Sequence, residues 1–129
     1  MSTNSEPDTG AFAIIPNNDL GNAIGFWEQL GFEHAGGAGQ YVIMKGWGCE
    51  VHLTQAGEEP WRIRPEANPF GVFIRTPYVD QIAERADAFI IRPGGLLRHR
   101  EWGLYEVGIN APDGLLLRVG WPSALIEQA

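Results

Sequence analysis

The chain has 129 residues and a mass of 14.2 kDa, which is the size of one domain with a single hydrophobic core. Hydrophobic residues make up 44% of the sequence and charged residues 19%, so the chain should fold. Nine basic residues against sixteen acidic ones give a net charge of −7, which argues against binding to nucleic acid or to an anionic membrane. Cys49 is the one cysteine, so the chain has no internal disulfide framework.

Residues 1–10 are polar and lack both the basic and the apolar segment of a signal peptide. We therefore expect a flexible N-terminal tail on a cytoplasmic protein, followed by a single domain over residues 11–129. No apolar run approaches the roughly 18 residues that a membrane-spanning helix needs.

The first half of the domain, about residues 11–54, predicts one helix among four strands. Apolar residues recur at three- and four-residue spacing from Leu20 to Leu30, which indicates a helix with Asn18 or Asp19 as its N-cap and Gly31 at its end. Alternating or short apolar runs predict strands around it. These strands are expected at 11–16, 32–35, 40–45 and 49–54, the last two as a hairpin around Gly46-Trp47-Gly48.

A polar, Pro-bearing connection follows at residues 55–69, and the second half covers about residues 70–121. Val79, Ile82 and Ala86 indicate a short helix. Pro112 and Gly114 predict a type I turn. Strands are expected at 70–75, 88–92, 104–110 and 115–120, with a loop at 93–101.

The two halves have the same order of elements. Leu20 and Val79 stand at equivalent places 59 positions apart, and the hairpin glycines Gly48 and Gly114 are 66 apart. The sequence therefore predicts an α+β fold of two βαβββ modules, whose curved mixed sheets surround a cleft that could bind a ligand.

Two segments carry a resemblance to a known family. Residues 18–20 with 25–32 (NDL, then GFWEQLGF) resemble one motif of the vicinal oxygen chelate superfamily. Residues 101–103 with 112–118 (EWG, then PDGLLLR) resemble the ending of its bleomycin resistance branch. The resemblance covers residues 11–121. The superfamily also contains glyoxalase I, extradiol dioxygenases and fosfomycin resistance enzymes.

The enzymes of this superfamily hold a metal ion on four strand positions. The resemblance places these positions at Phe12, His52, Gly71 and Arg118. One possible ligand in four cannot hold a catalytic divalent ion, which needs about three protein ligands. We therefore expect no metal, no cofactor and no catalytic residue.

The resemblance to the bleomycin resistance branch implies a homodimer, possibly with modules swapped between the chains, that sequesters a drug without chemistry. The ligand would be a bleomycin-like antibiotic, possibly metal-loaded, whose flat part stacks on aromatic side chains and whose cationic part is attracted by the acidic protein. The alternatives are a metal-dependent glyoxalase- or dioxygenase-type enzyme and a binder of another flat aromatic metabolite.

The candidate ligand-binding residues are mostly aromatic side chains expected on the cleft or at its rim. Each also has a structural alternative, such as core packing, a subunit contact, or an ion pair between Arg118 and Glu50 or Glu106. Trp27, by contrast, lies on the apolar helix face and is expected in the core. The candidates are Trp102, Tyr41, His52, Trp61, Phe73, Trp47 and Arg118.

Overall fold

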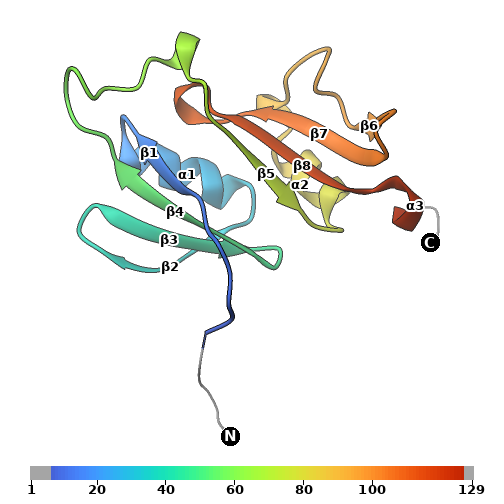
Figure 1. Ribbon diagram of the computed structural model, residues 1–129, viewed down its shortest axis with the longest axis horizontal. Coiled ribbons are helices and arrows are strands. Elements are labelled where there is room, and N and C mark those ends of the chain that lie inside the picture. Colours follow the sequence, from blue (N-terminus) through green and yellow to red (C-terminus); the bar gives the residue numbers. More distant parts are fainter. Residues whose placement is uncertain (1–6, 127–129) are drawn as a thin grey trace, which may run out of the picture.

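Two βαβββ modules follow one another along the chain in the computed structural model, which describes residues 7–126 (Figure 1). The α+β fold predicted from the repeat is thus confirmed. The first module consists of β1 (Ile14–Asn17), α1 (Leu20–Gln29), β2 (Glu33–Ala38), β3 (Tyr41–Gly46) and β4 (Cys49–Gln55). The connection contains the 3-10 turn η1 (Pro65–Ala67). The second module consists of β5 (Gly71–Arg75), α2 (Val79–Arg85), η2 (Asp87–Phe89), β6 (Arg98–His99), β7 (Leu104–Asn110), η3 (Pro112–Gly114) and β8 (Leu116–Pro122), followed by α3 (Ser123–Ile126).

Each module forms one four-stranded mixed sheet, in the orders β1-β4-β3-β2 and β5-β8-β7-β6. The pairs β1–β4 and β5–β8 are parallel, and the other neighbours are antiparallel. The registers of the two parallel pairs agree, because Ile15 lies opposite Leu53 in the first sheet and Ile74 opposite Val119 in the second. The repeat read from the sequence is therefore present strand by strand.

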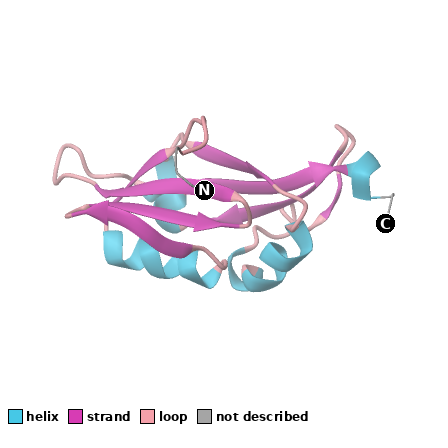
Figure 2. Ribbon diagram, turned by 90° about the horizontal axis from the view of Figure 1, so that it is seen from below, coloured by secondary structure: helices cyan, strands magenta, loops and turns pink. Residues whose placement is uncertain are grey.

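Helices α1 and α2 lie on the same side of the strands (Figure 2). The core fills the space between them, because every second strand residue points toward the helices. Trp27 is fully buried there, as predicted, and its ring meets Phe26 and Phe32 edge-on. The opposite face of both sheets is covered by no helix within residues 7–126. None of the helices in this range is long and apolar enough to cross a membrane.

The ends of α1 are those predicted from the sequence. The Asp19 carboxylate caps the helix by accepting from the backbone N–H of Asn22 at 3.0 Å. Gly31 follows the last turn with φ of +101°, a conformation that favours glycine. A side chain at Gly31 would also lie 2.7 Å from the ring of Trp47, whose Nε1 donates to the Leu30 carbonyl at 2.8 Å. The missing side chain thus lets the hairpin tip close over the helix end.

Three local predictions differ from the structure. The strand expected at 88–92 is wrong: residues 87–89 form η2, and Ile90 makes a single bridge to Ile109. The edge strand is instead β6, inside the segment expected to be a loop. The turn at 111–114 is a 3-10 turn in which Asp113 has φ of +62°, a left-handed conformation that a type I turn does not contain. Most of the tail predicted at 1–10 lies outside the described residues.

Candidate functional site

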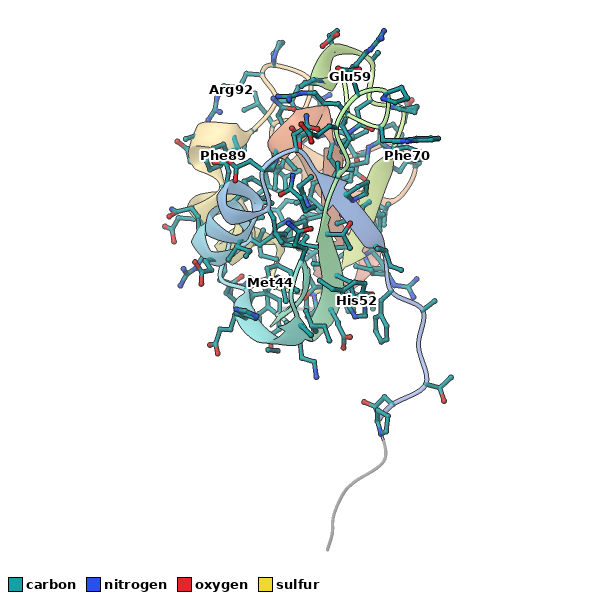
Figure 3. All side chains as sticks on the ribbon, turned by 90° about the vertical axis from the view of Figure 1, so that its left-hand side faces the viewer. Met44, His52, Glu59, Phe70, Phe89 and Arg92 are labelled. Carbon is teal, nitrogen blue, oxygen red and sulfur yellow. The ribbon has the colours of Figure 1, made fainter. Side chains whose placement is uncertain are left out.

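The sheet face opposite the helices carries most of the predicted site residues. Figure 3 shows His52 on the side of the molecule away from Phe89, which belongs to the helix side. In the first module the Tyr41 hydroxyl lies 2.5 Å from His52 Nδ1, and His52 Nε2 lies 2.6 Å from Glu50 Oε2. The Phe12 ring stacks on His52 with centroids 5.4 Å apart. Both imidazole nitrogens are therefore already engaged by protein groups.

In the second module two cross-strand rows place charged side chains on the same face. One row runs Phe73, Arg118 and Gly108 across β5, β8 and β7. The next row runs Arg75, Gly120, Glu106 and Arg98 across β5, β8, β7 and β6. Because paired strand residues project to the same side, these rows bring arginines from three strands around Glu106.

A groove of about 200 Å³ opens on this face beside the turn that joins β6 to β7. Its wall depends on two glycines. The Gly108 N–H donates to the Gly95 carbonyl at 2.8 Å, and a Cβ on Gly95 would lie 2.6 Å from the Gly108 oxygen. The loop after η2 can therefore lie flat against β7. The side chains in the groove are Trp102, Arg100, Arg118, Glu106, Leu116 and Ile91.

Glu106 and Arg100 are the polar centre of the groove. Glu106 is 3% exposed, and its Oε2 lies 4.0 Å from Arg118 Nε. The Arg100 guanidinium donates to the carbonyls of Gly94, Leu96 and Glu106. Within residues 7–126, Glu106 Oε1 and Arg100 Nε are buried atoms without a hydrogen-bond partner. Buried polar atoms are normally satisfied, so these two are candidates for contact with a ligand or ordered water.

The structure brings two of the predicted site residues, Trp102 and Arg118, into this groove. Phe73 lies directly opposite Arg118 on the neighbouring strand. Trp61 stands in the connection and is 77% exposed. Tyr41 and His52 belong to the other sheet.

Trp47 lies elsewhere, on the helix side between the end of α1 and the start of α2, where its ring packs against Tyr78. We therefore leave Trp47 out of the proposed site. Sequence reasoning missed Arg100, Gly95 and Ile91, because they come from segments expected to be a plain loop and a strand. The Gly94-Gly95 pair was the available signal, since it marks a close backbone approach.

The four positions at which the resemblance places a metal ion are equivalent in register. His52 lies opposite Ile14, and Arg118 opposite Phe73, so Phe12 and Gly71 precede their strand partners by the same two residues. Their chemistry does not fit a metal ion. Arg118 is a cation, Phe12 and Gly71 have no ligand atom, and His52 uses both nitrogens in hydrogen bonds. Among the residues described, no three His, Cys, Asp or Glu side chains are grouped to hold a metal.

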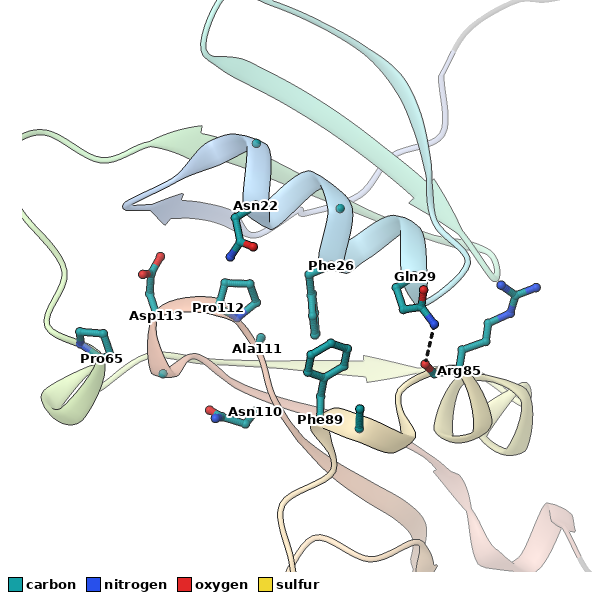
Figure 4. Close-up of a pocket in the computed structure, with 14 residues that line it drawn as sticks. Asn22, Phe26, Gln29, Pro65, Arg85, Phe89, Asn110, Ala111, Pro112 and Asp113 are labelled. Atoms are coloured by element: carbon teal, nitrogen blue, oxygen red, sulfur yellow. Dashed lines mark hydrogen bonds between the residues drawn. The ribbon is translucent and has the colours of Figure 1, made fainter.

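A second groove, of about 870 Å³, lies on the helix side between α1 and the η2 and η3 turns (Figure 4). Its apolar floor is the ring pair Phe26 and Phe89, with centroids 5.2 Å apart. Gln29 Nε2 crosses one end to donate to the Arg85 carbonyl at 3.3 Å. None of the predicted site residues lines it, and neither of the unpartnered buried atoms belongs to it. The sheet-face groove is therefore the stronger candidate.

No protein-family model matches the sequence, and no curated protein matches it. Solved structures do share its fold. A bleomycin-binding protein crystallised with bleomycin is 20% identical, with a TM-score of 0.73 over 88% of this chain and 98% of that one. A bleomycin resistance determinant encoded on the transposon Tn5 is 19% identical, with a TM-score of 0.72 over 89% and 98%. A glyoxalase/bleomycin resistance protein/dioxygenase from Nocardioides is 18% identical, with a TM-score of 0.66 over 93% and 86%. The chain thus has the fold of antibiotic-binding and glyoxalase-type proteins.

Proposed function

We propose that this protein binds and sequesters a small planar aromatic molecule in the sheet-face groove, in the cytoplasm and without chemical transformation. One observation carries the proposal. The groove combines an indole that is 56% exposed, at Trp102, with two buried polar atoms that have no partner in the described residues. An exposed Trp beside unsatisfied polar groups is costly in a free protein and favours a ligand with one flat face and a few polar atoms.

The antibiotic-binding neighbours make bleomycin-type drugs the first ligand class to test. The metal-dependent enzyme alternative has less support, because the donor set at Phe12, His52, Gly71 and Arg118 does not suit a divalent ion. A volume of about 200 Å³ is below the range of about 300–1,000 Å³ for pockets that enclose a drug-sized ligand. The groove would therefore hold one part of a larger ligand or the whole of a small one.

We also propose that the protein is a homodimer. The face that carries the groove leaves several large apolar side chains at least 40% exposed, and such patches mark interaction surfaces. A second copy on this face would cover them and extend the groove. Sedimentation or light scattering of the purified protein tests this, and a monomer at about 100 micromolar would contradict it. The exposed side chains are Phe12, Ile14, Phe73, Phe70 just before β5 and, in the connection, Trp61.

The binding function is tested by titrating the protein with neutral phenylnaphthylamine and, separately, with copper-loaded bleomycin. Fluorescence and calorimetry measure the response. We expect saturable binding at about one ligand per chain, lost in Trp102→Ala and kept in the control Phe89→Leu, which alters the helix-side groove instead. If no planar aromatic compound, neutral or charged, binds in a Trp102-dependent way at about 100 micromolar, where a 10 micromolar site would be largely filled, the proposal fails. Bleomycin binding by the wild type would assign the antibiotic class.

A further inference from the structure

The local charge of the groove is opposite to that of the whole protein. The chain carries −7, yet Arg100 and Arg118 line the groove beside the buried carboxylate of Glu106, and Arg98 lies opposite Glu106 on the neighbouring strand. Arg98 makes no ion pair among the described residues, and Arg118 approaches Glu106 only to 4.0 Å. Among the side chains of residues 7–126 that line the groove, two arginines, Arg100 and Arg118, therefore face one carboxylate, that of Glu106, and positive charge is in excess.

The arginines are close enough to affect one another. Burial lowers the pKa of Arg100 below its ordinary value, the nearby charges of Arg98 and Arg118 lower it further, and Glu106 opposes them. Arg100 is held by three backbone carbonyls. It cannot turn away into water without breaking these hydrogen bonds. Like charges held together in this way are relieved when an anion enters.

The two unpartnered atoms specify what the anion must carry. Arg100 Nε is a donor and needs an acceptor, whereas Glu106 Oε1 is an acceptor and needs a donor. Arg118 is half exposed, so its guanidinium can reach a ligand as well as Glu106. Trp102 supplies a flat surface at the same groove. A flat ring that bears an acidic group beside an N–H or O–H matches all four side chains.

We propose that the ligand is a planar aromatic anion whose carboxylate, sulfonate or phosphate is held by Arg118 and Arg100, while a neighbouring N–H or O–H donates to Glu106. This inference rests on the groove being the ligand site and refines the proposed function. It departs from the expectation that the acidic protein attracts a cationic drug. Net charge acts mainly on encounter over long distances, whereas the groove selects by contact.

Two probes with the same rings separate the contribution of the negative charge to affinity from the contribution of ring stacking. The peri-substituted anilinonaphthalene sulfonate carries a sulfonate beside an N–H, and phenylnaphthylamine has the same rings and N–H without the sulfonate. We expect the sulfonate to bind about tenfold or more tightly than the neutral probe, as charge-assisted hydrogen bonds to an arginine allow. Its affinity should fall as salt increases, whereas that of the neutral probe should not.

Arg118→Gln should remove most of the sulfonate's advantage and leave the neutral probe within about twofold. Arg85→Gln, on the helix side, is the matched control and should change neither affinity. Equal affinities of the two probes, both dependent on Trp102 and neither dependent on salt, would overturn the anion inference and leave the binding function intact. Loss of Trp102-dependent binding for both probes would overturn the binding function itself. The comparison of the two probes on the wild type decides the matter even if Arg118→Gln does not fold.

Discussion

Asn18 and Asp113 join the two modules across 95 positions of sequence. The Asn18 backbone N–H donates to Asp113 Oδ2 at 2.8 Å, and its Nδ2 donates to Asp113 Oδ1 at 3.0 Å. The same Asn18 amide exchanges two hydrogen bonds with the backbone of Ile63 in the connection. Asn68 then donates to the Asp113 carbonyl at 2.9 Å. One Asn and one Asp thus fix the first module, the connection and the second module together.

Asp113→Ala should lower the free energy of unfolding by about 2–3 kcal/mol. It removes two hydrogen bonds to a charged acceptor and leaves a Cβ-bearing residue at φ of +62° without the local bonding that an Asp provides. Urea unfolding measures the change. Asp113→Gly loses the same hydrogen bonds without the backbone strain and should be less destabilised. If Asp113→Ala is as stable as the wild type, the hydrogen bonds between Asn18 and Asp113 contribute nothing to stability.

The neighbouring glycines of the groove wall should respond differently to alanine. A Cβ on Gly95 would lie 2.6 Å from two backbone oxygens, those of Gly108 and Ile91, whereas a Cβ on Gly94 meets nothing within 4 Å. We expect Gly95→Ala to cost about 1–3 kcal/mol of stability and to weaken binding of the planar probes, because the loop must move off β7. Gly94→Ala lines the same groove and is the control. Thermal unfolding and probe titration of both variants check this, and equal behaviour of the two would refute it.

Tyr105 should ionise well above the ordinary pKa of a tyrosine, which is about 10. Its hydroxyl donates to Asp80 Oδ1 at 2.5 Å, and burial, helped by this hydrogen bond and the nearby charge, raises its pKa to about 12. The neutral phenol is favoured in the folded state, so its contribution to stability is complete below pH 10 and is lost as pH rises toward 12. The difference between the alkaline absorbance titrations of wild type and Tyr105→Phe isolates this group. A difference spectrum that appears near pH 10 would contradict the prediction.

Chelation should leave ligand binding unchanged. The four positions at which the resemblance places a metal ion hold one imidazole, that of His52, and both of its nitrogens are in hydrogen bonds. Elemental analysis of the purified protein should therefore find well below one divalent ion per chain. Overnight treatment with EDTA should leave the affinity for the neutral probe within about twofold. A tightly held ion, or activity that returns when zinc or manganese is added back, would favour the enzyme alternative.

Much of the architecture could be predicted from the sequence, because it depends on local signals that occur twice. The spacing of Leu20, Trp27 and Gly31 fixes a helix with its end, and the hairpin glycines recur at a matching place. The 88–92 segment failed because its apolar side chains are used in a turn and one bridge. The edge strand is β6 instead, next to Arg100, whose guanidinium donates to three carbonyls four to six residues away.

The charge of the site could not be predicted in the same way. Total composition indicates an acidic protein that attracts cations. Only the register of β6, β7 and β8 places Arg98 in the same cross-strand row as Glu106 and Arg118 in the adjacent row. A one-residue slip of β6 or β8 would move its arginine to the helix side. Sheet register depends on contacts between distant segments, so the ligand's charge is visible only in the folded chain.

Because the two parallel strand pairs have matching registers, positions on these strands in one module have corresponding positions in the other. His52 and Arg118 occupy corresponding places, as do Ile14 and Phe73. The two halves therefore carry different surfaces on the same framework. One half has the hydrogen-bonded chain Tyr41, His52 and Glu50, and the other has the cation Arg118. The corresponding places differ in their antiparallel neighbours as well, because His52 lies opposite Ile43 and Arg118 opposite Gly108. One strand arrangement thus presents two different sets of polar side chains within a single chain.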